Sequence, residues 1–379
     1  MPIIDTILVG RGPGETRLAA LSGELVVEIY HHRDVEAHVG DIFLGRSGKP
    51  VPGLGAVFVN IGLEKDGVLQ DTRPLPAEGE TIAVQVIRSP YSEKGARLKT
   101  ADPKENLVIS EMARPPVLLA RGPNPLQTCM LFYGDTVQRV LCEPAAHALE
   151  LKAHFRRKSS IISGNTSRQG LFELHGVEDV IMTAVDPVVR LPSGGRLIIQ
   201  NTRALTAIDV DSGSGDPITA NREAVEETVR QLRLRNIAGH ILVDLIPGQK
   251  DKSFLQTMRI AVADDPIHTQ VAGYTPLGML ELTRRRVRPS LSELLLAGED
   301  GARLTNIDTV AYAALRNVVR QGLASTSSHV MLEAHPSVIS ILKTRLRSAL
   351  DEASASLKLA VVLCARADFV LERVEVVLN

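Results

Sequence analysis

Three aspartates stand in two apolar, strand-like segments of this sequence. Residues 204–211 read ALTAIDVD, and residues 240–246 read HILVDLI. Side chains alternate between the faces of a β-strand, so Asp209 and Asp211 share one face of the first segment, and Asp244 interrupts an apolar face of the second. Because burying an unpaired carboxylate costs several kcal/mol, such acids are normally paired, hydrogen-bonded or bound to a metal.

Three carboxylates that converge from neighbouring strands would bind a hard divalent cation, and magnesium is the usual choice. Such a cation generates hydroxide from water near neutral pH and stabilises charge on the reacting phosphate. The pattern therefore indicates phosphodiester hydrolysis, although its spacing suits a phosphatase or a nucleotidyl transferase equally well. For any one of these acids taken alone, a strand end that faces water or pairs with an arginine is an equally good interpretation.

The elements around these acids predict an α/β region over residues 194–262, with strands alternating with helices. A helix is expected between the two acidic strands, with Asn221 as its N-cap. Val225, Val229 and Leu232 recur at helical spacing and give that helix one core-facing stripe.

Other parts of the chain have different patterns. From residue 36 to about 100, short strands punctuated by glycine fit a five-stranded Greek-key barrel of the OB type. Residues 104–190 mix strands with helices, as an α/β layer would. Residues 303–379 read as helix, strand, helix, strand, strand, which predicts a small α+β unit.

Composition sets broad limits. With 379 residues, 44% of them hydrophobic, the chain is long enough for two or three globular domains. The 43 basic and 44 acidic residues nearly cancel, so a polyanion would need a local basic surface. No apolar run reaches the ~18 residues of a membrane span, and the N-terminal ten residues do not resemble a secretory signal, so we expect a cytoplasmic protein. Three cysteines without CxxC spacing favour reduced thiols over disulfides or structural zinc.

Several long motifs resemble the RNase E/G endoribonucleases, in that family's order, over most of residues 22–294. The stretches similar to its catalytic domain are LPSGGRLIIQNTRALTAIDVDSG, EAVEETVRQLRLRNIAGHILVDLI and GMLELTRRRVRPSLSEL. Those similar to its inserted OB-fold domain are VGDIFLGR, VPGLGAVFVNIGLEKDGVL and EKGARLKT. The resemblance implies a mixed α+β fold: N-terminal strands (1–35) packing on the catalytic core, an OB-fold RNA-binding domain (36–100), a shortened RNase H-like subdomain (101–190), a DNase I-like catalytic subdomain (191–300) and a small C-terminal α+β domain (301–379).

The resemblance also implies roles for the acids. The family holds magnesium with the aspartates that match Asp209 and Asp244. It usually has asparagine where this chain has Asp211, which would be a third ligand or a base that orients water. The exchange keeps an oxygen ligand and adds a negative charge.

In the OB domain, the resemblance implies that RNA bases stack on Phe58, while the family's second stacking aromatic falls on Val68. Lys94 and Arg97, in EKGARLKT, match the segment suited to phosphate contact. The alternative, from the sequence alone, is that Phe58 is a barrel-core aromatic. Base stacking contributes ~1 to 3 kcal/mol per base, so the exchange to Val68 would matter.

Two features of the family are missing. The cysteine pair that forms its zinc link after RPSLSE is absent, so zinc is not expected. The Arg-Thr motif that reads a 5′ monophosphate is not found between Thr100 and Pro115, where the chain is much shortened. Two basic clusters fit an RNA path but are more often solvated faces: Arg156, Arg157, Lys158 and Arg168, and Arg284, Arg285, Arg286 and Arg288.

The sequence therefore predicts a magnesium-dependent endoribonuclease that cleaves single-stranded RNA and leaves 5′-phosphate and 3′-hydroxyl ends, in RNA processing or decay that includes rRNA maturation. A homodimer is also considered. The alternative is a non-cleaving RNA-binding protein in ribosomal RNA maturation, which Val68 and the missing motif favour and the retained acids disfavour. A phosphohydrolase acting on small nucleotides is a weaker hypothesis, because it does not require the large OB insertion.

Overall fold

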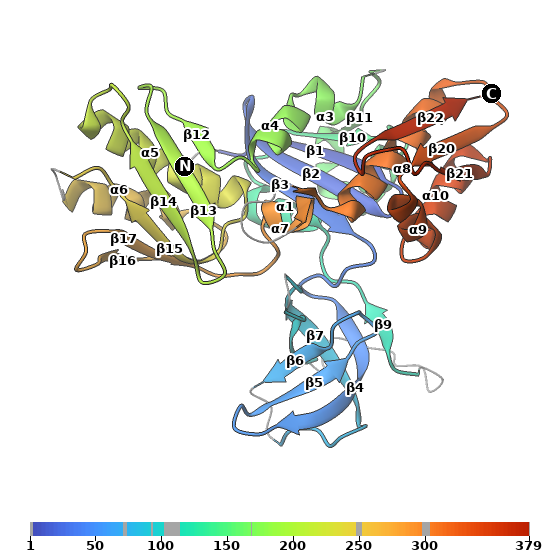
Figure 1. Cartoon of the computed structure of the whole chain (residues 1–379), viewed down its shortest axis with the longest axis horizontal. Helices are drawn as coiled ribbons and strands as arrows, with labels where there is room; N and C mark the ends of the chain where they lie inside the picture. The colour runs from blue at the N-terminus through green and yellow to red at the C-terminus, as the bar shows by residue number, and fades with distance from the viewer. Residues whose placement is uncertain are drawn as a thin grey trace.

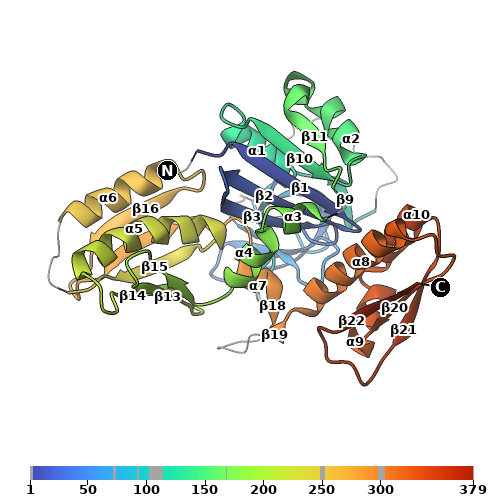
Figure 2. The ribbon, with the colours of Figure 1, turned by 90° about the horizontal axis from the view of Figure 1, so that it is seen from above.

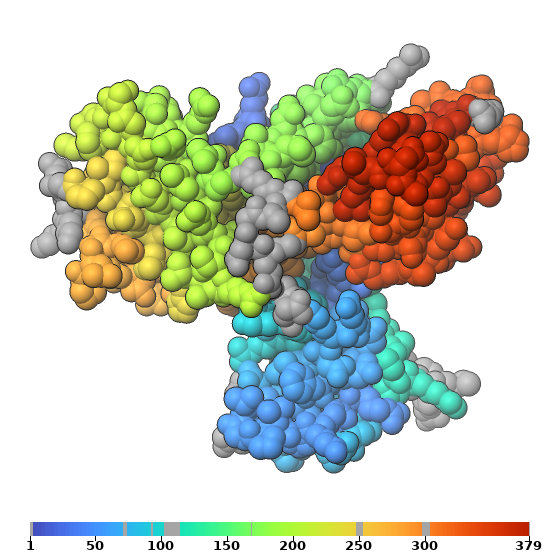
Figure 3. Space-filling view, in the orientation of Figure 1, coloured from blue at the N-terminus to red at the C-terminus, as the bar shows by residue number. Residues whose placement is uncertain are grey.

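The computed structural model describes residues 3–70, 74–91, 94–101, 114–167, 169–247, 252–297 and 304–378. Figure 1 shows a central sheet, a barrel below it, a second sheet on one side and a small C-terminal unit on the other. From above, the N-terminal strands lie between the two flanking units (Figure 2). In the space-filling view, the barrel is a distinct lobe beneath the main body (Figure 3). The expected mixed α+β class is confirmed. None of the helices within the described ranges is both long and apolar enough to cross a membrane.

The central sheet joins two separate stretches of the chain. Its strands are β1 (Thr6–Gly12), β2 (Glu15–Ser22), β3 (Leu25–Arg33), β10 (Arg139–Glu143) and β11 (Ile162–Gly164). Their order is β11-β10-β1-β2-β3, with β1 parallel to β10 and antiparallel to β2. Residues 6–33 and 139–164 thus contribute strands to one sheet. Whether that sheet is of the RNase H-like type stays a prediction.

Both faces of the central sheet are buried, and this explains the continuous apolar run at the start of β1. Ile7 and Val9 pack into one hydrophobic cluster, while Leu8 packs into another on the opposite face. The covering helices are α1 (Pro125–Tyr133), α2 (His147–His154), the 3₁₀ helix η1 (Arg156–Ile161), α3 (Leu171–Leu174) and α4 (Val177–Thr183).

The glycine-punctuated segment forms a closed five-stranded barrel, as expected, and its closure is consistent with an OB-like fold. Its strands are β4 (Ile42–Val51), β5 (Ala56–Asn60), β6 (Gly67–Gln70), β7 (Thr81–Arg88) and β8 (Arg97–Thr100), with β9 (Val117–Ala120) added beside β4. Closure follows because β4 pairs with both β5 and β7. Val57, Val59, Leu69 and Leu98 fill the barrel core.

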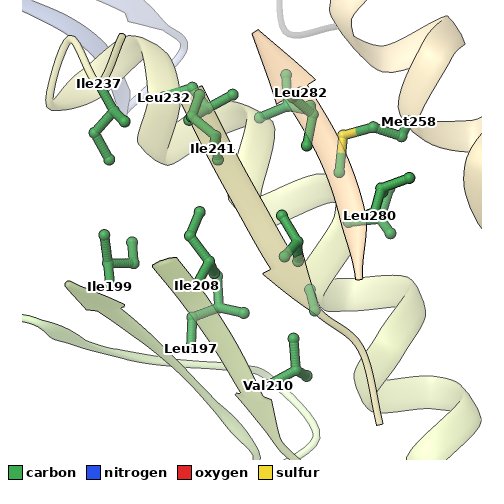
Figure 4. Close-up of a cluster of buried hydrophobic side chains, with 14 of the residues drawn as sticks. Leu197, Ile199, Ile208, Val210, Leu232, Ile237, Ile241, Met258, Leu280 and Leu282 are labelled. Atoms are coloured by element: carbon green, nitrogen blue, oxygen red, sulfur yellow. The ribbon is translucent and has the colours of Figure 1, made fainter. Parts of the chain in front are cut away.

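The second sheet carries the acidic strands. It contains β12 (Val188–Arg190), β13 (Arg196–Asn201), β14 (Leu205–Asp211), β15 (Gly239–Asp244), β16 (Thr269–Tyr274) and β17 (Leu280–Arg284), in the order β12-β13-β14-β15-β17-β16. β14 and β15 are the parallel pair, and α5 (Pro217–Leu234) connects them. This helix and α6 (Lys252–Ala263) pack against one face through the hydrophobic cluster in Figure 4.

The predicted start of α5 was wrong. Asp216 is the N-cap, its side chain accepts the Thr219 amide, and Pro217 occupies the first helical turn. Asn221 lies one turn inside the helix and is buried. The Asp-Pro pair is therefore the stronger start signal, and the side chain of Asn221 serves another purpose described below. The expected stripe of Val225, Val229 and Leu232 is confirmed as part of the core.

The C-terminal unit packs beside the central sheet. It follows α7 (Leu291–Leu295), β18 (Leu296–Ala297) and β19 (Leu304–Thr305), and contains α8 (Ile307–Ala324), β20 (Val330–Ala334), α9 (Pro336–Lys343), α10 (Arg347–Leu357), β21 (Val361–Ala365) and β22 (Val374–Leu378). Two helices, α9 and α10, stand where the sequence predicted one. The three strands form a small sheet in the order β21-β20-β22.

Candidate functional site

Asp209 and Asp244 lie side by side at the same edge of the second sheet. The parallel pairing of β14 with β15 sets Asp209 directly opposite Asp244. Neighbouring strands are about 4.8 Å apart, so the two backbones bring both carboxylates to one place. Ile208 and Val210 on either side of Asp209 are buried, as is Val243 before Asp244, while both aspartates are exposed, which confirms the predicted alternation.

The two carboxylates are also uncommitted. Neither Asp209 nor Asp244 makes an ion pair or hydrogen bond with any residue of the described part of the chain. No cluster of three or more His, Cys, Asp or Glu side chains suited to a metal is found among those residues. Magnesium is usually bound through one or two carboxylates and keeps several waters, so this open pair has the donor chemistry that such an ion needs.

Asp211 follows on the same face, but it is already engaged. Arg196, directly opposite on β13, donates from Nη2 and Nε to Asp211 Oδ2 at 2.7 and 2.9 Å. The Gly213 amide donates to Oδ1 at 2.8 Å. This amide, and after it Arg196, lower the pKa of Asp211 below its usual value. The structure therefore brings Asp209 and Asp244 together and ties Asp211 to a guanidinium.

Asn221 positions the chain just beyond Asp244. Its amide nitrogen donates to the Ile246 carbonyl at 3.2 Å, and its amide oxygen accepts the Ile246 amide at 3.0 Å. These two bonds fasten the end of β15 to α5 through a buried side chain. Sequence reasoning interpreted Asn221 as a helix cap and missed this role, because the partner lies on a distant strand.

The barrel presents a row of side chains across its strands. Phe58 on β5 lies opposite Val68 on β6, Val68 opposite Arg97 on β8, and Arg97 opposite Arg88 on β7. Phe58 is 46% exposed, so the alternative of a barrel-core aromatic is excluded. Val68 is half-buried beside it, where the resemblance led us to expect a second aromatic.

Lys94 belongs to a cluster of cations around Tyr91. The Lys94 ammonium lies 5.5 Å from the centre of the Tyr91 ring, and the guanidinium carbons of Arg88 and Arg286 lie 4.9 and 4.4 Å from it. Neither Arg88 nor Tyr91 was singled out from the sequence. The one sequence feature that could have identified them is their position in the chain just before the basic EKGARLKT segment.

The second basic cluster is mostly structural. Arg284 is buried and paired with Asp265 at 2.7 Å, and Arg286 pairs with Glu293 at 3.0 Å. Arg288 lies over the Tyr30 ring at 4.1 Å. Arg285 alone in this run is exposed. The interpretation of this run as a solvated face is therefore wrong for three of its members.

The first basic cluster lies only partly within the described residues. Arg156 and Arg157 are exposed on η1, and Lys158 donates to the Gly134 carbonyl at 2.7 Å. Arg168 and the stretch 102–113, where the Arg-Thr motif was sought, lie outside the described residues.

Comparison with known proteins agrees with the motifs. The sequence model of the Ribonuclease E/G family matches residues 100–287, which include Asp209 and Asp244. Ribonuclease G of Escherichia coli is 27% identical, and the alignment covers 89% of this chain and 92% of the relative. Ribonuclease G of Salmonella typhimurium is 28% identical, with coverages of 91% and 94%. Ribonuclease E of a Nostoc species is 28% identical over 72% of this chain and 54% of its own length.

Proposed function

We propose that this chain, which belongs to the ribonuclease E/G family, is an endoribonuclease that cleaves single-stranded RNA. Its cellular role would be RNA processing or decay, including the maturation of ribosomal RNA. The observation that carries the proposal is the exposed, in-register pair of Asp209 and Asp244. The exposed aromatic Phe58 on an OB-like barrel supports RNA as the substrate.

Asp209 and Asp244 would hold a magnesium ion. When bound, such an ion supplies hydroxide from water near neutral pH and stabilises negative charge on the phosphate. The chain itself fixes the positions of the two carboxylates: the buried flanking residues hold β14 and β15 against the helices, and Asn221 fastens the chain beyond Asp244. Because the carboxylates have no other partner among the described residues, binding an ion would break no existing ion pair.

In the proposed reaction, a water oxygen forms a bond to phosphorus and the bond from phosphorus to the 3′ oxygen breaks. A proton from that water ends on the 3′ oxygen, so the products carry a 5′ phosphate and a 3′ hydroxyl. Asp211 would take part as a hydrogen-bond acceptor beside the reacting water. The pairing with Arg196 offsets its charge, so its effect on the site approaches that of the family's asparagine.

On the barrel, Phe58 would stack on a base, and Lys94 and Arg97 would contact phosphates. A base stacked on an aromatic ring contributes ~1 to 3 kcal/mol, and the contact is tolerant of sequence. With valine at position 68, this chain would have one stacking platform in the row where the family has two. We therefore expect weaker binding through the barrel alone and greater dependence on phosphate contacts.

The test uses an unstructured fluorescent oligoribonucleotide with wild type and Asp209→Asn. The wild type should cleave the RNA with magnesium and stop when EDTA is added, and the variant should not cleave under either condition. Binding measured in EDTA should be nearly equal for the two proteins. Equal cleavage by variant and wild type would falsify the assignment of Asp209.

A second candidate is an RNA-binding protein without nuclease activity. The valine at position 68, in place of a stacking aromatic beside Phe58, favours it. The same assay separates the two functions, because a binding protein would retain the RNA intact with or without EDTA. Product ends would be read by ligation, which requires a 5′ phosphate and a 3′ hydroxyl.

A further inference from the structure

A pocket lies where the barrel meets the second sheet. Its cavity measures about 550 Å³, and its wall combines the end of β7, the start of β8 and the segment that follows β17. In Figure 1, β7 lies at the top of the barrel, towards the main body. The Ser89 amide donates to the Val287 carbonyl at 3.0 Å, which joins the two sides of the pocket.

Four arginines line this pocket: Arg88 and Arg97 from the barrel, and Arg285 and Arg286 from the segment after β17. Two of them have unused hydrogen-bonding capacity. Arg88 Nε is buried, and it has no hydrogen-bond partner within the described ranges. The Arg285 side chain is exposed and makes no contact with a counter-ion in the same ranges.

The charges in the pocket repel one another. Burial first, and then the positive charges of Arg97 and Arg286, lower the pKa of Arg88. The Tyr91 ring attracts Arg88 and Arg286 without using their N–H donors, so it holds both guanidinium groups in place and leaves the Arg88 donors free. The donors of Arg286 already serve Glu293 and the Ala238 carbonyl. An anion with several acceptor oxygens would satisfy these donors and relieve the repulsion.

We propose that this pocket binds a phosphate group of the RNA chain, between the barrel and the acidic edge of the second sheet. The inference rests on the proposed function, because it takes RNA as the ligand. Arg88 and Arg285 would supply the hydrogen bonds, one from each side of the junction. Arg286, already paired with Glu293, would hold the wall together.

The row on the barrel leads into the pocket. Arg97 and Arg88 end the row that starts at Phe58, and both also line the pocket. On the other side, Arg285 follows Arg284, which pairs with Gly239 at the start of β15. Asp244 lies at the far end of β15, roughly 17 Å away at about 3.3 Å per residue. A strand bound on Phe58 and in the pocket would thus continue along the sheet towards Asp209 and Asp244.

The experiment measures binding of an unstructured, 3′-labelled oligoribonucleotide in EDTA, at salt concentrations from about 50 to 200 mM. For single strands, each neutralised phosphate contributes about 0.7 to the slope of log K against log salt. The Arg88→Gln/Arg285→Gln variant should bind roughly tenfold more weakly, with a slope lower by about 0.7 for each phosphate that is no longer neutralised. Arg347→Gln, at an exposed position of α10 in the C-terminal unit, removes one charge as a control and should leave the slope unchanged.

Two further arms sharpen the result. Arg88→Lys/Arg285→Lys keeps both charges, so its slope should match wild type even if the glutamine variant fails to fold. RNA with a 5′ hydroxyl is compared with RNA carrying a 5′ monophosphate. If the glutamine variant loses affinity equally for both RNAs, the pocket holds an internal phosphodiester. If it loses affinity only for the RNA with a 5′ monophosphate, the pocket holds a terminal phosphate.

An unchanged slope in a folded glutamine variant, or a slope lowered by the lysine variant as much as by the glutamine one, would overturn the pocket assignment. Cleavage by the wild type is scored separately with magnesium. If the wild type cleaves RNA and the variants bind RNA as tightly as the wild type, the proposed function stands and only the pocket assignment fails. If the wild type binds no RNA, both the proposed function and the pocket assignment fail. If it binds RNA through the pocket but does not cleave it, only the proposed nuclease activity fails.

Discussion

Two groups of charged side chains in this protein have opposite surroundings. Glu15 on β2 is 1% exposed and lies against Arg33 of β3, whose Nε donates to Oε1 at 3.1 Å, and against Arg316 of α8. Asp209 and Asp244 are exposed and have no counter-ion among the described residues. A buried acid requires a resident counter-ion, whereas an exposed acid can stay available to an ion or substrate from solution.

We call Glu15 with Arg33 and Arg316 the closed group, and Asp209 with Asp244 the open group. The pKa of Glu15 shows how the closed group contributes to folding. Burial by itself raises that pKa, but the charges of Arg316 and His31 hold it well below its usual value. The ionised form is therefore favoured by folding, and the three elements β2, β3 and α8 are held together by it. This group joins the C-terminal unit to the central sheet, while the open acids have only the surface beside them.

The largest effect is expected at the open group. Asp244→Asn should lower the cleavage rate roughly a thousandfold or more, because losing a metal ligand removes several kcal/mol of transition-state stabilisation. The same change at an exposed position should alter the free energy of unfolding by no more than about 0.5 kcal/mol. Single-turnover cleavage and urea unfolding measure the two quantities. A large loss of stability with unchanged cleavage would reverse the roles assigned to the two groups.

The next effect is expected at the closed group. Glu15→Gln removes the buried carboxylate that pairs with both Arg33 and Arg316, and breaking a buried ion pair costs roughly 3 to 5 kcal/mol. The free energy of unfolding should fall by that amount, while cleavage per folded molecule stays the same. Asp351→Asn, in an exposed pair with Arg347, is the matched control and should change stability by less than about 1 kcal/mol. If Glu15→Gln and Asp351→Asn lowered the free energy of unfolding equally, the buried position of Glu15 would not explain its contribution to stability.

His32, next to Arg33 on β3, should control how the free energy of unfolding depends on pH. Burial first, and then His38, lower the pKa of His32 from 6.5 to about 3, and the two rings stack at 3.7 Å. Between pH 6.5 and about 3, the unfolded chain binds a proton at His32 that the folded chain excludes. Stability therefore falls as the pH falls through this window, with a slope of up to ~1.4 kcal/mol per pH unit for this group.

His32→Gln should flatten that part of the profile, measured by urea unfolding at a series of pH values. His329→Gln, at an exposed position, serves as the control and should leave the profile as in wild type. A wild-type profile that is already flat between pH 6.5 and about 3 would rule out the role of His32.

The smallest effect is expected where an ion pair borders the open group. Asp211 lies roughly 7 Å along β14 from Asp209, so in water its unit charge changes the energy of a nearby divalent cation by about 1.2 kcal/mol, which screening by ~0.1 M salt roughly halves. Arg196→Gln exposes the charge of Asp211 and should lower the half-saturating magnesium concentration two- to threefold. Asp211→Asn leaves Arg196 unpaired and should raise it by a similar factor. Shifts in the same direction would argue that the pair acts through backbone geometry instead of charge.

Much of the acidic edge could be predicted from local pattern. Strand alternation in ALTAIDVD and HILVDLI placed Asp209, Asp211 and Asp244 on their faces correctly, because a period of two follows from strand geometry alone. The closed barrel also followed from short strands and glycines. The N-cap of α5 was misplaced, because the cap signal was assigned to Asn221 and the Asp-Pro pair upstream was overlooked.

The arginine run 284–288 shows the limit of that approach. Four of its five residues are arginine, yet their environments differ. Arg284 is buried against Asp265, Arg286 pairs with Glu293 and Arg285 is exposed. Charge pattern does not distinguish these environments, because each partner comes from a different part of the chain.

Local pattern is sufficient to predict which side chains share a face and which segments are apolar enough to form a core. It does not predict that β14 lies next to β15 with Asp209 opposite Asp244, that Arg196 reaches Asp211, or that Arg88 faces the segment of Arg285; these follow from the packing of the folded chain. Alternation is a property of one strand, whereas register and neighbours depend on packing between segments distant in the chain. The chemistry could therefore be inferred from the residues, and its assembly into a site depended on how the sheets pair and where the barrel docks.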